Sequence, residues 1–115
     1  MFDFEKLTVY QKTKSQNARI LKLIYQSKEI DPYIKDQWKR ATLSVALNIA
    51  EGCGRVGKSD KKYFYTVARS SVYECVAILD VLRVSELIEL DVLREIYMDY
   101  EQISKMLLAL YRSVR

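Results

Sequence analysis

Residues 38–59 constrain the fold of this chain more than any other stretch. They fit two incompatible structures, and the choice between the two decides the fold class. The segment begins with Trp38, carries no charge from Ala41 to Ala50, and ends in a basic turn that holds all three glycines. That turn matches two nucleotide-binding patterns, G-x-x-x-x-G-K-[ST] and G-x-G-x-x-G. Residues 42–49 also alternate small or polar side chains with apolar ones, as strands do. Taken literally, the segment predicts a strand followed by a nucleotide-binding loop.

The rest of the chain favours a helix followed by a turn. No other short segment has the alternation of a strand that could pair with this one. A phosphate-binding enzyme of this kind also needs a second acidic motif that holds magnesium, which the sequence lacks. Three glycines and one proline in 115 residues are few for the turns of a sheet-containing fold. Trp38, Ala41 and Val45 are spaced as one helix face, so we expect a helix from about Pro32 to about Cys53.

Turn and capping signals divide the chain into four helices. Thr8 and Gln11 form a T-x-x-Q capping box that starts the first helix. Asp31 and Pro32 end that helix and start the second one, as its N-cap and first helical residue. Ser59 or Asp60 caps the third helix, which runs to about Ser85. Asp91 caps the fourth helix. We therefore expect residues 1–115 to form one domain, an all-α, antiparallel, up-down-up-down four-helix bundle.

The composition argues against most kinds of catalytic and metal site. The chain has no histidine, which removes the usual general base, the usual zinc ligand and every Ser-His or Cys-His pair. Cys53 and Cys75 lack metal-ligand spacing and, in an antiparallel helix pair, are offset by roughly 20 Å, too far for a disulfide. We expect buried thiols, no metal, no cofactor and no enzymatic activity. Without a secretory signal or a membrane-spanning run, we expect a cytoplasmic protein with no membrane partner.

A hairpin of the second and third helices about residue 57 predicts which residues lie at the same height. Arg40 is then level with Glu74, and we expect a partly buried ion pair between them, although two separately solvated charges are the alternative. Asn48 and Glu51 lie one turn apart near the end of the second helix. We expect them to form a polar network with Tyr63 or Thr66, and solvent exposure near a helix end is the alternative.

Basic residues gather in the turn and at the start of the third helix. The cluster consists of Arg55, Lys58, Lys61 and Lys62, extended by Arg69, and faces one acid, Asp60. A helix N-terminus adds free N–H groups and partial positive charge, so this is a plausible phosphate site. Tyr63 and Tyr65 are near enough to stack on unpaired bases. The alternative is that these charges only solvate a loop. Cations of the first helix could enlarge the cluster: Lys12, Lys14, Arg19 and Lys22.

Charge is unevenly distributed along the chain. Residues 1–69 hold 14 Lys/Arg and 7 Asp/Glu, whereas residues 70–103 hold 2 Lys/Arg and 8 Asp/Glu. Residues 104–115 add three positive charges and no acid. Such segregation permits one basic and one acidic surface, which matters for steering a polyanion or for head-to-tail assembly. Nine tyrosines and Trp38 also exceed what one small bundle needs in its interior, which favours an interface between copies.

Several motifs resemble one bacterial protein family. They are Leu7-Thr-Val-Tyr-Gln11, Arg40-Ala-x-x-Ser44, Asn48-Ile-Ala-Glu-Gly52, Gly54-Arg55 and Ala68-x-Ser-Ser-x-x-Glu74. In these the chain is similar to the four-helix-bundle proteins of the 23S rRNA intervening-sequence family. The resemblance implies the bundle fold and an oligomer. A related branch, the accessory variability proteins of diversity-generating retroelements, forms pentameric barrels that bind nucleic acid and a reverse transcriptase.

Charge pattern and resemblance together give two expectations for function. The first is a non-enzymatic homo-oligomer, a pentamer by the resemblance, that binds RNA or DNA through the basic residues. The second is a ring-shaped protein–protein scaffold that recruits a partner such as a polymerase without contacting nucleic acid.

Overall fold

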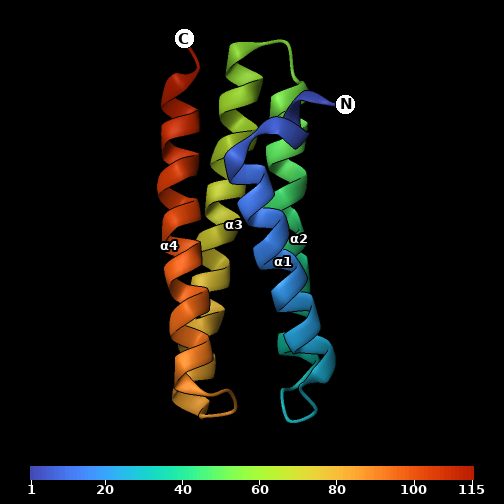
Figure 1. Cartoon of the computed structure of the whole chain (residues 1–115), viewed down its shortest axis with the longest axis vertical. Coiled ribbons are helices and arrows are strands. Elements are labelled where there is room, and N and C mark those ends of the chain that lie inside the picture. The colour runs from blue at the N-terminus through green and yellow to red at the C-terminus, as the bar shows by residue number, and fades with distance from the viewer.

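The structure, a computed structural model, describes all 115 residues and contains helices but no strands. A short 3-10 helix, η1 (Asp3–Lys6), precedes four α-helices: α1 (Thr8–Gln26), α2 (Pro32–Gly54), α3 (Lys58–Ser85) and α4 (Leu90–Ser113). The helices run alternately up and down in an elongated bundle of 44 × 22 × 21 Å (Figure 1). The predicted all-α four-helix bundle is confirmed, and residues 38–54 are helical.

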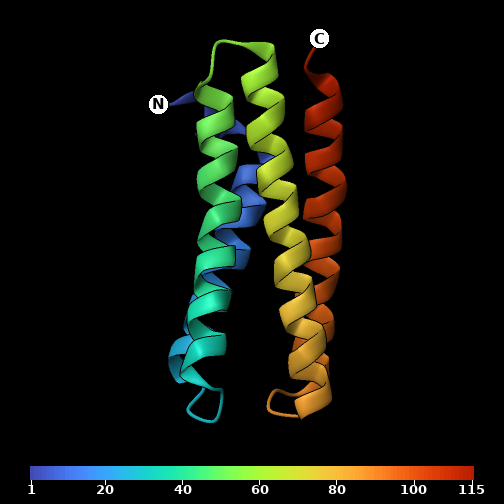
Figure 2. The same cartoon turned by 180° about the vertical axis from the view of Figure 1, so that it is seen from behind.

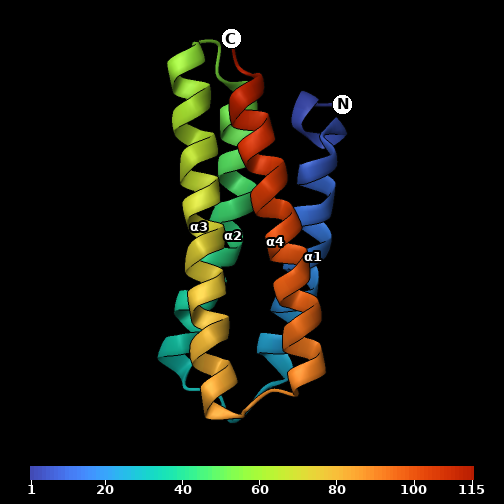
Figure 3. The same ribbon diagram turned by 90° about the vertical axis from the view of Figure 1, so that its left-hand side faces the viewer.

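The four helices form a closed arrangement. Each α-helix contacts the next one along the chain, and α1 also contacts α4. Figure 3 shows α4 beside α1 on one side of the bundle and α3 beside α2 on the other. The α2–α3 turn and both chain termini lie at one end, here called the turn end (Figures 1 and 2). The α1–α2 and α3–α4 loops lie at the opposite end, the loop end.

The core is built from one apolar stripe of each helix. Trp38 of α2 and Tyr100 of α4 are its largest fully buried side chains. Isoleucine, leucine and valine fill the remaining space, as expected for helices that bury one face each. The uncharged run 41–50 is less buried than its composition suggests, because Leu43 and Leu47 are 51% and 57% exposed on the outer side of α2.

The helix starts differ from the predicted caps at three of four positions. Asp31 does cap α2, since its Oδ1 accepts a hydrogen bond from the Tyr33 backbone N–H at 2.8 Å. α1 begins at Thr8 as predicted, but the capping box is wrong: the N-cap is Leu7, and the Glu5 carbonyl of η1 accepts from Gln11 Nε2 at 3.0 Å. The N-cap of α3 is Gly57, two or three residues before the predicted one, and that of α4 is Glu89, two residues before; neither makes a side-chain cap.

Gly52 permits the close contact between the end of α2 and the start of α3. A Cβ at this position would lie 2.8 Å from the Tyr65 ring and 2.9 Å from Phe64 Cβ. At Gly54, by contrast, a Cβ would meet no atom within 4 Å. Neither glycine has the positive φ that a tight phosphate-binding loop requires. The glycine pattern therefore reflects helix packing and a helix end.

Candidate nucleic-acid interface

The five predicted basic residues all lie at the turn end, on the α2 terminus and the first three turns of α3. Lys58 is exposed and forms no ion pair. Arg55 lies over the Phe64 ring at 4.7 Å and forms an exposed ion pair with Glu51 at 3.5 Å. Both cations therefore keep their charge near solvent, where a phosphate could reach them.

Lys61 has a different role from its neighbours. Its Nζ donates hydrogen bonds to the Cys53 carbonyl at 2.8 Å and the Gly52 carbonyl at 3.4 Å. These carbonyls belong to the last turn of α2, where the Gly52 carbonyl also accepts from the Arg55 backbone N–H at 3.2 Å. A cation is also favourable at the negative end of a helix. Lys61 thus serves mainly to cap α2 and to hold the turn.

Lys62 and Arg69 reach from α3 toward α4. Lys62 Nζ lies 5.0 Å from the centre of the Tyr111 ring. Arg69 donates from Nε to the Ser104 carbonyl at 3.3 Å, and its guanidinium lies over the Tyr73 ring at 5.2 Å. These contacts place the start of α3 directly beside the end of α4.

The end of α4 contributes cations that the sequence analysis did not include in the site. Because α3 and α4 are antiparallel, residues 102–115 lie beside residues 58–73. Together, residues 55–73 and 102–115 hold eight Lys/Arg and one acid. The contribution of these cations was predictable from the sequence, since residues 104–115 carry three cations and the predicted topology places them beside the start of the third helix. We call the following residues the basic surface: Arg55, Lys58, Lys62, Arg69, Lys105 and Arg112.

A groove of about 460 Å³ opens between α3 and α4 within the basic surface. We call it the tyrosine groove, because Tyr65, Tyr73 and Tyr111 line it together with Arg69 and Leu108. Tyr73 is 59% exposed, whereas Tyr65 is almost fully buried and contributes to the floor. Burial raises the pKa of the Tyr65 hydroxyl above its usual value, with a smaller contribution from Cys53. Tyr63, predicted to stack on bases, is exposed and packs edge-on against Phe64.

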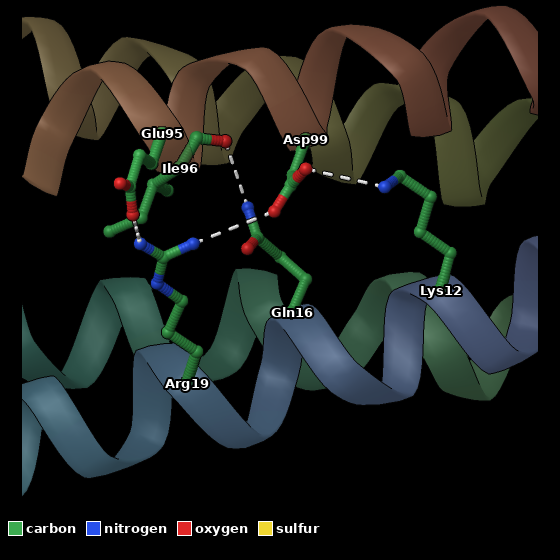
Figure 4. A network of polar contacts seen from close by, with 6 residues as sticks. All are labelled: Lys12, Gln16, Arg19, Glu95, Ile96 and Asp99. Atoms are coloured by element: carbon green, nitrogen blue, oxygen red, sulfur yellow. Dashed lines mark hydrogen bonds and ion pairs between the residues drawn. The ribbon is translucent and has the colours of Figure 1, made fainter.

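Two of the four α1 cations predicted to enlarge the basic surface, Lys12 and Arg19, instead pair with acids of α4. Lys12 forms an ion pair with Asp99 of α4 at 3.2 Å, and Arg19 pairs with Glu95 and, at 3.6 Å, with Asp99 (Figure 4). Gln16, between them, donates from Nε2 to the Ile96 carbonyl at 2.9 Å. Opposite charges from the basic and acidic parts of the chain thus neutralise each other along the α1–α4 contact.

The match to a known family covers most of the chain. A family model described as the 23S rRNA-intervening sequence protein matches residues 5–109. This chain belongs to the 23S rRNA-intervening sequence protein family. Among solved structures it resembles a protein of unknown function from the S23 ribosomal protein family of Bacteroides thetaiotaomicron, at 21% identity and a TM-score of 0.85. That similarity covers 91% of this chain and 96% of the other, and it shows a shared fold. The comparison with curated proteins gives no match.

This intervening-sequence protein does not form the predicted ion pair between Arg40 and Glu74. Both residues line the same shallow pocket, with Ser44 and Ser71, so their predicted common height is correct. Both side chains are exposed, however, and no ion pair joins them. The inward positions between the helices belong to Ser44 and Ser71, whose hydroxyls are 2.8 Å apart.

The polar network around Asn48 has other partners than those predicted. Asn48 Nδ2 donates to the Ser44 carbonyl at 2.8 Å and to Ser44 Oγ at 3.0 Å. Through Ser44 the network continues to Ser71 of α3. Thr66 bonds within its own helix, to the Lys62 carbonyl, and Glu51 is exposed and pairs with Arg55. The height rule that placed Arg40 beside Glu74 also fits Ser44 and Ser71, so this contact could have been found from the sequence.

Of the two thiols expected to be buried, Cys75 is buried, whereas Cys53 is only half-buried. Cys53 and Cys75 are free thiols, and Cys75 is fully buried with Thr42 Oγ1 3.9 Å from its sulfur. Burial raises the pKa of the Cys75 thiol to about 11, which disfavours the reactive thiolate. No group of three or more His, Cys, Asp or Glu side chains is placed to hold a metal ion. No helix is long and apolar enough to cross a membrane.

Proposed function

We propose that this 23S rRNA-intervening sequence protein is a non-enzymatic nucleic-acid-binding protein whose basic surface contacts phosphates. The observation that carries the proposal is the convergence of cations from two separate segments, the start of α3 and the end of α4, with one acid among them. Intramolecular ion pairs neutralise Lys12 and Arg19 of α1, whereas Lys58, Lys105 and Arg112 have no acidic partner within 4 Å. Unneutralised cations on one surface are what attracts a polyanion.

A salt-dependent binding measurement tests this proposal. Fluorescent RNA and DNA, each as a hairpin and as a single strand, are titrated with the protein across about 50 to 300 mM salt. We expect the affinity to fall steeply with salt, since each phosphate contact releases counterions and gives a slope of about −0.7 to −0.9 in a double-logarithmic plot.

Matched charge reversals locate the contact. The double variant Lys58→Glu/Arg112→Glu removes two cations of the basic surface, and we expect it to weaken binding about tenfold or more and to flatten the salt dependence. The control Lys22→Glu/Lys28→Glu makes the same change in net charge on exposed residues far from the turn end. Lys61 is left intact in both, because it caps α2. Equal losses in the two variants would show that only net charge matters and would contradict the proposed surface.

A second observation supports self-assembly. A groove of about 570 Å³ lies between α3 and α4 nearer the loop end, and mainly apolar side chains line it. Met98 and Tyr97 of α4 line this groove and are 65% and 48% exposed. We propose that a neighbouring copy covers this groove, and that a closed ring, of five copies by the family resemblance, is the active form. The same groove also suits the alternative of a scaffold that recruits a protein partner, which we favour if the assembled protein binds no nucleic acid at the lowest salt.

A further inference from the structure

We infer that the tyrosine groove binds an unpaired nucleobase, so that the protein prefers single-stranded segments to duplex. The inference rests on the proposed nucleic-acid binding and deepens it by naming the class of ligand. The groove is lined by residues of both α3 and α4, and its volume of about 460 Å³ is within the range of small-molecule sites, about 300–1,000 Å³. A duplex cannot enter a groove between two packed helices, whereas a single base can.

The lining of the groove matches the chemistry of a base. Tyr73 and Tyr111 offer aromatic rings at its two ends, and Leu108 adds apolar surface between them. Aromatic rings bind bases by stacking, with little regard to base identity, because every base has a π-face. Ser70 is exposed and makes no side-chain hydrogen bond, so its hydroxyl is available for the edge of a base.

The charge around the groove matches the flanking phosphates. Lys62 lies over the ring of Tyr111, and Arg69 lies over the ring of Tyr73. The cations lie 5.0 and 5.2 Å from the centres of the two rings. Single-strand-binding sites use the same combination of aromatic rings and nearby cations. An apolar protein segment would leave both cations without a counter-charge, which favours the nucleotide as the occupant.

The test compares one strand with the duplex that it forms. Binding of a mixed-sequence single strand and of its blunt duplex is measured for the wild type, Tyr73→Ala and Tyr111→Ala. We expect each alanine variant to lose at least about fivefold in affinity for the single strand, as stacking on one ring typically contributes, and to bind the duplex as the wild type does. The salt dependence should keep its slope, because no cation is removed. Tyr73→Phe and Tyr111→Phe keep the rings and should bind the single strand within about twofold of the wild type.

Two further measurements keep the outcome clear. Ultraviolet cross-linking of an oligothymidylate to the unmodified protein, followed by peptide mapping, should place the cross-link on residues 65–73 or 108–111. Circular dichroism of each variant shows whether it is folded, so that a loss of single-strand affinity is not mistaken for a loss of the fold. If the wild type binds both probes but the alanine variants do not lose single-strand affinity, or lose duplex affinity equally, the groove inference is wrong while the proposed function stands. If the wild type binds neither probe, the proposed function itself fails.

Discussion

Gly52 matches a nucleotide-binding pattern, but its role in the structure is to allow close packing of two helices. It is the first glycine of both nucleotide-binding patterns, yet its missing side chain leaves room for the Tyr65 ring and Phe64 Cβ at the α2–α3 contact. Sequence patterns of this length record only residue identity, and the same glycine suits a phosphate loop and a close helix contact. The structural setting, a helix end beside another helix, decides between them.

Gly52→Ala should therefore destabilise the bundle. A methyl group 2.8 Å from the Tyr65 ring forces the helices apart, and such overpacking costs about 1–3 kcal/mol. This exceeds the roughly 0.5–1 kcal/mol that alanine gains over glycine within a helix. Gly54→Ala is the matched control: no atom lies within 4 Å of its Cβ position, so its free energy of unfolding should be equal to or above that of the wild type. Urea unfolding of both variants checks this, and equal stability of the two would contradict the packing role of Gly52.

At the scale of helices, the contact between α1 and α4 includes a network of three ion pairs. Asp99 accepts a hydrogen bond from Lys12 and forms an ion pair with Arg19, which donates its hydrogen bond to Glu95 (Figure 4). The Asp99 side chain is 37% exposed, so water and salt weaken these attractions. These ion pairs therefore contribute modestly to the free energy of unfolding in dilute buffer, and less at high salt.

Asp99→Asn tests that contribution. We expect the free energy of unfolding to fall by up to about 1 kcal/mol at low ionic strength, and the difference to shrink toward zero near 1 M salt, where the screening length is about 3 Å. Asp80→Asn removes a single exposed pair with Arg83 within α3 and should change stability less. Denaturant unfolding of both variants at two salt concentrations provides the comparison. A loss in Asp99→Asn that salt does not reduce would mean that packing, and not charge, holds α1 to α4.

Element positions were more predictable from the sequence than side-chain directions. Pro32 and the scarcity of turn residues fix where helices can start and stop, so α2 ends within one residue of its expected position. The height rule for the α2–α3 hairpin likewise placed Arg40 level with Glu74. It carries no information on rotation about each helix axis, which is why the expected ion pair is absent. Contacts between α1 and α4 depend on closure of the whole bundle, and local patterns do not encode them.

At the scale of the whole molecule, charge is arranged along the bundle axis. The basic surface lies at the turn end, whereas residues 74–101, the loop-end parts of α3 and α4 with the loop between them, carry eight acids and two cations. The apolar groove with Met98 on its rim lies nearer this acidic part. A contact through this groove alone would be directional, since nothing requires the neighbouring copy to present the same groove in return. Directional contacts close into rings when the rotation between copies permits it.

Met98→Glu tests this arrangement. A carboxylate on the rim would have to be buried without a partner on assembly, so we expect the variant to remain a monomer of 13.5 kDa in light scattering. The wild type should show a multiple of that mass, five by the family resemblance. Tyr25→Glu is the control, because Tyr25 is 90% exposed on α1 and lines none of the α3–α4 grooves. A wild type that stays monomeric at all concentrations would exclude the ring.

The two termini lie at the same end of the bundle as the α2–α3 turn, so the chain can be circularly permuted (Figures 1 and 2). A flexible linker from residue 115 to residue 1 would join the ends into a circle, and opening that circle at residues 86–89 would make α4 the first helix. Such a circular permutant keeps all helix contacts of the bundle and moves its free ends to the loop end. A tag attached to the present C-terminus emerges beside the basic surface, whereas one attached to the permuted ends leaves that surface clear.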